Sequence, residues 1–294
     1  MTKILILGGG GMVGQKLANH LLASGLPGHK TLDITLFDMA FPLKQDGRLS
    51  CITGSLTDAQ NITMLAQLRP DLIFHLASIV SGEAESNFDA GWQVNMFTMW
   101  HYLEAVRKLH VETGGTYVPK IIFTSSSAVF GGPFPEQIDD TFLSAPQTSY
   151  GAQKASCELL LSDFSRKGFV DGISLRLPTI CVRPGKANLA ASSFFSGIIR
   201  EPLNGQKAIL PVDESVRHWH ASPRAAAGFL RHAATLDSRL LENRRALNLP
   251  GVSCTVAEQI EALRRAAGQS VVNLIERRPD DTIINIVSSW PRNF

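Results

Sequence analysis

The chain has 294 residues, of which 44% are hydrophobic and 18% charged, as expected of a globular protein with a large core. Its net charge is +2, and no long run of like charge predicts a nucleic-acid-binding arm or a polybasic membrane patch. The four cysteines lack zinc-ligand spacing, and no apolar run approaches the roughly 18 residues of a membrane span. We therefore expect a soluble cytoplasmic protein with reduced thiols, no metal, and no nucleic-acid or membrane partner.

Expected strands and helices alternate through the first part of the chain. The apolar run at 3–7 is expected to be a buried strand, followed by glycines and a helix over 12–23. Further strands are expected at 33–37, 49–53, 71–76, 120–124 and 172–177, with helices at 58–68, at 88–109 and around residue 150. This alternation predicts an α/β fold with a Rossmann-type, doubly wound parallel sheet.

The pattern changes after Pro178, where prolines interrupt shorter elements. A helix over 222–236 and a strand over 246–249 are expected to return to the sheet, whereas 256–267 and 271–275 are expected to form a smaller lobe. We expect a first domain over 1–177, to which 212–250 returns. A discontinuous substrate-binding lobe would consist of 178–211 and 251–294.

Four consecutive glycines follow the first expected strand. Gly8, Gly11 and Gly14 satisfy Gly-x-x-Gly-x-x-Gly, and Gly9 with Gly11 and Gly14 satisfies Gly-x-Gly-x-x-Gly, so the sequence fits both patterns. Such glycines let the backbone approach a pyrophosphate at a helix N-terminus. Asp38 ends the second expected strand, where a carboxylate can accept from both hydroxyls of an adenosine ribose and repels a 2′-phosphate. Because no arginine closely follows Asp38, the sequence favours NAD over NADP.

Tyr150 and Lys154 lie four residues apart, which places both side chains on one face of a helix. A neighbouring ammonium stabilises a phenolate against the ordinary Tyr pKa of about 10, so the phenol can act as a base near neutral pH. The isolated pair is also typical of a solvated helix edge. Behind a cofactor-binding turn, it predicts a catalytic pair.

The order of these motifs resembles the extended short-chain dehydrogenase/reductase family, which also includes nucleotide-sugar epimerases and dehydratases. The resemblance covers residues 3–180, and its matching segments are 8–14, Asp38, 71–78, 94–95, 121–131, 150–154 and 175–178. It implies that the following residues contact the cofactor: Gly8, Gly11, Met12, Val13, Gly14, Asp38, Leu76, Ala77, Ser78, Asn95, Tyr150, Lys154, Pro178 and Ile180. Leu76 to Ser78 would line the adenosine side, and Pro178 to Ile180 would border the nicotinamide.

The resemblance also implies catalytic roles. Tyr150 would be the base, and Lys154 would keep the phenolate accessible and donate to the nicotinamide ribose. Ser126 would donate to the substrate oxygen, with Ser127 as the alternative because three serines follow one another. These serines can also simply satisfy backbone groups after a strand.

Segments of the second half, at 176–188, 191–195, 217–223 and 246–251, resemble family members that oxidise the C2 hydroxyl of a four-carbon sugar acid with NAD. A carboxylate favours a bidentate arginine, and Arg183 and Arg217 are the candidates. Relatives place a substrate-binding arginine at the position of Arg217, and either arginine can instead form a surface ion pair. Ser192 is expected to line the substrate pocket with Ser126, Ser127 and Tyr150.

Two other functions fit parts of the pattern. A nucleotide-sugar epimerase or reductase would need a second diphosphate site, and an NAD-sensing regulator usually lacks the Tyr and Lys pair. Relatives often place an aspartate after the glycine where Ser55 follows Gly54, and they usually continue beyond 294, so we expect a further C-terminal segment. The aromatic stripe from Trp92 to Trp100 is expected to be core or the face of a possible homodimer.

Overall fold

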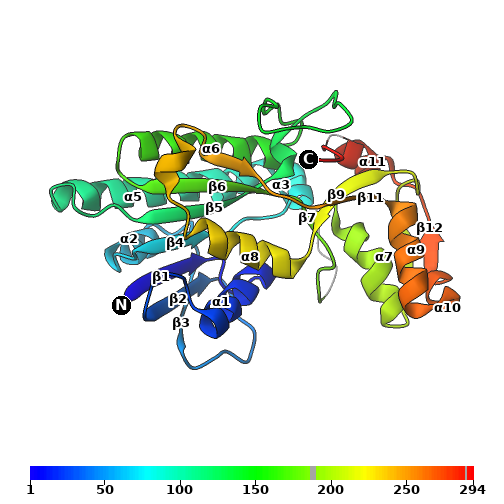
Figure 1. Ribbon diagram of the computed structural model, residues 1–294, viewed down its shortest axis with the longest axis horizontal. Helices are drawn as coiled ribbons and strands as arrows, with labels where there is room; N and C mark the ends of the chain where they lie inside the picture. The colour runs from blue at the N-terminus through cyan, green and yellow to red at the C-terminus, as the bar shows by residue number, and fades with distance from the viewer. Residues whose placement is uncertain (186–189, 289) are drawn as a thin grey trace.

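The sheet is the centre of the molecule. In a computed structural model, which describes residues 1–185, 190–288 and 290–294, seven strands form one sheet (Figure 1). All neighbouring strands pair in parallel. Their order is β10 (Ala246–Asn248), β6 (Asp171–Leu177), β5 (Lys120–Ser126), β4 (Leu72–His75), β1 (Thr2–Leu7), β2 (Leu32–Asp38) and β3 (Leu49–Thr53). The predicted doubly wound parallel sheet is confirmed.

Helices cover both faces of this sheet, which explains the continuous apolar runs of its strands. Along β1, Leu5 and Leu7 pack into one core, and Ile4 and Ile6 pack into the other. The first core contains α2 (Ala59–Gln67), α5 (Thr98–Glu112) and α6 (Ser149–Arg166); the second contains α1 (Met12–Ser24) and α8 (Pro223–Ala233). The strand order reverses between β1 and β4, where sheets of this type bind ligands.

The helical stretch predicted over 88–109 is confirmed, and the structure adds a π-helical turn within it. The structure has α3 (Ser81–Ser86), α4 (Phe88–Trp92), a π-helical turn (Gln93–Phe97) and then α5. Within the π turn, Asn95 is buried and its Oδ1 accepts from the backbone N–H of Ile79 at 2.8 Å. Its Nδ2 donates to Gln153 Oε1 on α6 at 2.8 Å. The wider turn thus carries a polar side chain that joins α6 to the segment after β4.

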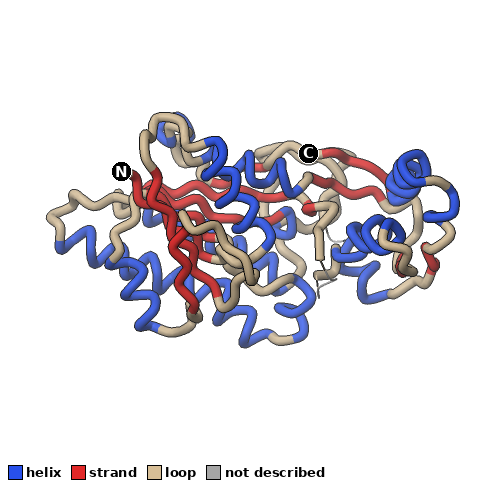
Figure 2. Tube along the Cα trace, turned by 90° about the horizontal axis from the view of Figure 1, so that it is seen from below, coloured by secondary structure: helices blue, strands red, loops and turns tan. Residues whose placement is uncertain are grey.

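A smaller lobe lies beyond the carboxyl ends of the strands (Figures 1 and 2). One small sheet has the order β11 (Val252–Thr255), β9 (Arg217–Ala221) and β7 (Thr179–Ile180), and another pairs β12 (Ile275–Arg277) with β8 (Ala208–Leu210). Its helices are α7 (Ser193–Leu203), α9 (Val256–Ala267), α10 (Gln269–Val272) and α11 (Asp281–Ser288). The segments 256–267 and 271–275, which were expected to form a smaller lobe, contribute α9, the end of α10 and the start of β12.

The segment 212–250 is divided between the two parts. Helix α8 packs on α1 in the second core and β10 extends the main sheet, whereas β9 belongs to the small sheet. The proposed domain boundaries remain a prediction. Within the described part of the chain, no helix is long and apolar enough to cross a membrane.

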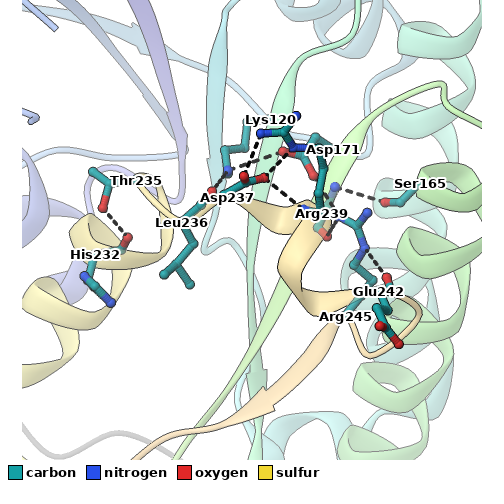
Figure 3. A network of polar contacts seen from close by, with 11 residues as sticks. Lys120, Ser165, Asp171, His232, Thr235, Leu236, Asp237, Arg239, Glu242 and Arg245 are labelled. Carbon is teal, nitrogen blue, oxygen red and sulfur yellow. Dashed lines mark hydrogen bonds and ion pairs between the residues drawn. The ribbon is translucent and has the colours of Figure 1, made fainter. Parts of the chain in front are cut away.

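An ion-pair network fixes the returning segment at the amino ends of β5 and β6 (Figure 3). Lys120 Nζ lies 3.3 Å from the Asp171 carboxylate and donates to the carbonyl of Leu236 at 2.5 Å, and Arg245 Nη1 lies 2.7 Å from the same carboxylate. Burial alone raises the pKa of Asp171. Hydrogen bonds from Ser238 and Arg245, with the charge of Lys120, outweigh that effect and hold the pKa below its ordinary value.

Candidate active site

The glycine turn between β1 and α1 is tightly packed. Gly8 has a φ of +85°, and a Cβ there would lie 2.7 Å from the backbone nitrogen of Ala77. A Cβ on Gly14 would lie 2.4 Å from the Gly8 oxygen, and one on Gly9 would lie 2.7 Å from the Leu36 Cβ. Gly8, Gly9 and Gly14 are therefore sterically required. At Gly11, by contrast, the nearest atom is the Gly8 oxygen at 3.4 Å, so the protein leaves room where a pyrophosphate would approach.

Met12 and Val13 form the first turn of α1. Their side chains pack inward, Met12 near Ile180 and Val13 in the second core. Neither residue lines the pocket at Asp38 or the pocket at Tyr150. Their backbone N–H groups, at the open start of the helix, are suited to an anion.

Asp38 lies at the end of β2, beside the glycine turn. Its Oδ2 accepts from the Gly10 N–H at 2.9 Å and its Oδ1 from the Met39 N–H at 2.7 Å. A carboxylate has about four acceptor positions, so Asp38 can accept further hydrogen bonds.

The pocket at Asp38 is suited to an adenosine. Its lining residues are Gly8, Gly11, Phe37, Asp38, Met39, Gly54, Ser55, Leu56, Thr57, Leu76, Ala77, Ser78, Ile79 and Val94. None of these described residues is a lysine or arginine that would hold a 2′-phosphate. The sequence had singled out the position of Ser55, where relatives often carry an aspartate, but it had not indicated Leu56 and Thr57, whose contribution depends on the position of the loop after β3.

A second pocket brings the catalytic candidates together. Ser126, at the end of β5, and Tyr150, in the first turn of α6, both line it. The approach is close because Gly151 lies against the loop after β5, where a Cβ would come within 2.1 Å of the Ala128 oxygen. Ser126 Oγ accepts from the Ala128 N–H at 3.1 Å, which leaves its hydroxyl hydrogen for another acceptor. Ser127 lines the same pocket, so both serines remain candidates.

Lys154 lies one turn after Tyr150 and is 1% exposed. Its Nζ donates to the Thr124 carbonyl at 2.9 Å and lies 5.5 Å from the centre of the Tyr150 ring. His75, the histidine within β4, is also buried, as expected of a core histidine. Burial, aided by the charge of Lys154, lowers the pKa of His75 to about 3, so this imidazole is neutral. His75 therefore adds no positive charge here, whereas the Lys154 amine lies close to the Tyr150 ring and the Arg183 guanidinium interacts electrostatically with Tyr150.

Arg183 enters the same pocket from the segment after β7. Its Nε donates to the Ile180 carbonyl at 3.0 Å and its Nη2 to Ser192 Oγ at 2.9 Å. Among the described residues no carboxylate lies within ion-pair distance of this guanidinium, and burial lowers its pKa from the ordinary value. A mostly buried cation without an anion is a strong indication of an anionic ligand.

Arg217 does not lie in this pocket. It begins β9 on the surface, where its Nη2 is 3.4 Å from Glu258 and its Nη1 donates to the Ser253 carbonyl at 3.1 Å. Strand β9 pairs with β11, and that register directs Arg217 toward the start of α9 rather than toward Tyr150. In the structure, Arg217 therefore forms a surface ion pair, which was one of the two roles considered for it.

The remaining lining residues come from distant parts of the chain. The pocket is completed by Val80, Ser81, Thr124, Ser125, Leu177, Pro178, Thr179, Ile180, Ala190, Ser192 and Trp290. Pro178, Ile180 and Ser192 were expected there, whereas Ser81 and Trp290 were not. No local motif marks these two residues, because only the packing of α3 and of the C-terminal segment brings them to Tyr150. The pocket is rich in hydroxyl groups and has one guanidinium.

Comparison with known proteins agrees with this geometry. Residues 4–248 match the NAD dependent epimerase/dehydratase family. The chain belongs to this family. A D-erythronate dehydrogenase from Cupriavidus necator is 46% identical over 98% of this chain and 89% of that protein. The D-erythronate dehydrogenase of Haemophilus influenzae is 43% identical over 98% of this chain and 90% of that protein.

Solved structures show the same fold. A nucleoside-diphosphate-sugar epimerase from Agrobacterium tumefaciens has a TM-score of 0.92 at 50% identity, covering 100% of this chain and 86% of that one. An L-threonine dehydrogenase from Clostridium difficile has a TM-score of 0.84 at 23% identity, covering 100% of this chain and 89% of that one, and shares the fold. The family and the relatives identify the chain as an NAD-dependent oxidoreductase.

Proposed function

We propose that this enzyme oxidises the C2 hydroxyl of a short sugar acid, D-erythronate, to 2-dehydro-D-erythronate. The observation that carries the proposal is the mostly buried Arg183, which has no carboxylate partner among the described residues and lines one pocket with Tyr150 and Ser126. The D-erythronate dehydrogenases at 46% and 43% identity support the same substrate.

The proton chemistry is assigned to Tyr150. NAD, when bound, supplies the hydride acceptor for the reaction. The Tyr150 phenolate takes the proton of the C2 hydroxyl, and the ammonium of Lys154 stabilises that phenolate. Ser126 donates a hydrogen bond to the same substrate oxygen, and Ser127 is the alternative donor.

The cofactor is held by the turn and the adenosine pocket. Gly8, Gly11 and the first turn of α1 would hold the pyrophosphate, and Asp38 would accept from the adenosine ribose. Asn95 acts indirectly, because its amide is used within the protein to hold Ile79 beside that pocket.

The acid end of the substrate is assigned to Arg183 and Ser192. The Arg183 guanidinium is already oriented by Ile180 and Ser192, which leaves its remaining N–H donors for a carboxylate. With C1 held there and the C2 oxygen at Tyr150, the substrate is anchored at two adjacent carbons. This restricts which hydroxyl reaches the base.

A nucleotide-sugar epimerase is the second candidate, because the Agrobacterium structure carries that description at 50% identity. A nucleotide sugar brings two phosphate charges. Among the described residues that line the pocket, Arg183 is the sole arginine or lysine. A sugar acid, with one carboxylate, matches this single charge better.

The test is a turnover panel with the intact chain. D-erythronate with NAD is expected to give NADH, whereas NADP is expected to support little turnover and UDP- or GDP-sugars are expected neither to bind nor to react. No NADH from any four-carbon sugar acid would refute the proposed substrate. Epimerisation of a nucleotide sugar would establish the second candidate instead.

We also propose that the chain forms a homodimer through α4, α5 and α6. Large apolar side chains remain exposed there, including Phe88, Phe97, Trp100 at 39% and Leu159. The aromatic stripe from Trp92 to Trp100 is thus only partly buried in the core. Sedimentation of the wild type should give a dimer, and Trp100→Glu should shift it toward monomer; a wild-type monomer at all concentrations would refute the assignment.

A further inference from the structure

A rigid histidine lies behind the pocket. His218 on β9 is 1% exposed, and its Nε2 is 2.7 Å from Thr179 Oγ1 on β7. The imidazole stacks on Phe195 with ring centres 4.8 Å apart and an interplanar angle of 5°. Trp290 lies at 5.7 Å from the same imidazole. These contacts fix the ring, and with it the position of Nε2 relative to Thr179 Oγ1, whichever atom donates the hydrogen bond.

The Thr179 hydroxyl keeps unused hydrogen-bonding capacity. Burial holds the pKa of His218 well below its ordinary value, so the imidazole is neutral and has one donor and one acceptor nitrogen. If Nε2 donates, Thr179 keeps its hydrogen; if Nε2 accepts, Thr179 keeps its lone pairs. In the described part of the chain, His218 is the only hydrogen-bond partner of Thr179 Oγ1. Thr179 can therefore bind a further hydroxyl in either tautomer.

Thr179 lines the pocket that contains Tyr150 and Arg183. Building on the proposed function, the carboxylate and the C2 oxygen of the acid are held by Arg183 and Tyr150. The hydroxyls beyond C2 would then need partners elsewhere in the pocket, because an unpaired buried hydroxyl is costly.

We propose that Thr179 binds a hydroxyl of the sugar acid beyond C2, and that His218 is a positioning residue that orients the Thr179 hydroxyl for this contact. Together they make the enzyme select polyhydroxy acids over simple 2-hydroxy acids. Both residues lie in segments that resemble relatives, at 176–188 and 217–223. Their contact does not follow from the sequence, because they lie on different strands that the small sheet brings together.

The deciding variant is Thr179→Val, which removes the hydroxyl with little change of shape. The measured quantity is the ratio of kcat/KM for D-erythronate to that for 2-hydroxybutanoate of the same C2 configuration, which lacks the later hydroxyls. We expect the ratio to fall about tenfold in Thr179→Val, because kcat/KM falls for D-erythronate and not for 2-hydroxybutanoate. NAD affinity should not change.

His218 is tested by a pair of variants. His218→Phe keeps an aromatic ring for Phe195 but loses Nε2, and it should lower the ratio as Thr179→Val does. His218→Gln retains an amide near that nitrogen and should restore part of the ratio. Because His218 acts through Thr179, the double variant with His218→Phe and Thr179→Val should show the same ratio as Thr179→Val alone.

His220→Phe is the matched control. His220 lies on the same strand and contacts Phe195 at 4.8 Å, but it bonds Gln259 instead of Thr179. Its replacement disturbs the same core and should leave the ratio unchanged. If His218→Phe does not fold, His218→Gln alone supplies the comparison with this control.

The outcomes separate the two proposals. If the wild type oxidises no sugar acid, the proposed function and this inference fail together. If D-erythronate is oxidised but Thr179→Val keeps the wild-type ratio, the Thr179 assignment alone is overturned. Additive losses in the double variant, or an equal fall in His220→Phe, would overturn the positioning role of His218.

Discussion

Replacing Arg183 by methionine is the sharpest test of the carboxylate site. The guanidinium has five N–H donors, and the protein uses those directed at Ile180 and Ser192. The others are available for two parallel hydrogen bonds to a carboxylate. Methionine keeps much of the aliphatic stem and removes the charge, so the substrate carboxylate would lose its partner in a mostly buried site.

The expected loss follows from the burial of the pair. Removing one partner of a buried, hydrogen-bonded charge pair costs about 3–5 kcal/mol. At 1.36 kcal/mol for each factor of ten, this lowers kcat/KM for D-erythronate by roughly 10² to 10⁴-fold. NAD affinity should be retained, because Arg183 does not line the adenosine pocket.

The assay is steady-state NADH formation, with NAD binding measured by calorimetry. Arg217→Met is the matched control, because it removes the other candidate arginine, which is exposed and paired with Glu258. It should change kcat/KM by less than about fivefold, as expected of a surface pair. The reasoning would be refuted by the opposite order, in which Arg217→Met loses activity and Arg183→Met does not.

Burial also predicts the effect of Arg183→Met on stability. The lowered pKa of Arg183 means that its charged form is disfavoured in the folded protein. Removing this charge should therefore leave the free energy of unfolding within about 1 kcal/mol of the wild type, despite the two lost hydrogen bonds. Chemical denaturation measures this. A variant destabilised much further would indicate a structural role for the arginine.

Three other changes test the cofactor, the base and the fold. Tyr150→Phe should lower kcat by about 10² to 10⁴-fold and spare NAD affinity, so lost affinity in calorimetry would contradict its assignment as a base. Asp38→Asn should lower the ratio of kcat/KM with NAD to kcat/KM with NADP about tenfold or more. An unchanged ratio would show that Asp38 does not contact the ribose. Because the folded pKa of Asp171 is depressed, its stabilisation is present above its ordinary value of 3.8 and is lost as the pH falls through the lower folded value. Asp171→Asn should therefore destabilise the protein at neutral pH, and denaturation curves should converge with those of the wild type in acid; a constant difference would argue against this ion pair.

The parts of the candidate site that are local in sequence could be placed from the sequence. The glycines at Gly8 and Gly14 follow directly from the tight packing of a strand, a turn and a helix. Asp38 lies at the end of a strand, and parallel strands place their carboxyl ends at one edge. Tyr150 and Lys154 share one helix, whose period fixes their relation. In each case the position of the residue follows from the geometry of one turn, one strand end or one helix.

The sequence by itself thus determined the parallel sheet, the glycine turn after β1 and the placement of Tyr150 and Lys154 on one helix, because periodicity and turn chemistry act over a few residues. Only the tertiary structure distinguished the positions of the two arginines. The pairing of β9 with β11 places Arg217 against Glu258, whereas the segment after β7 brings Arg183 into the pocket of Tyr150. The same holds for Thr179 and His218, which meet only because β7 and β9 pair. Contacts between distant segments depend on how the lobe packs against the sheet, and no local pattern encodes that packing.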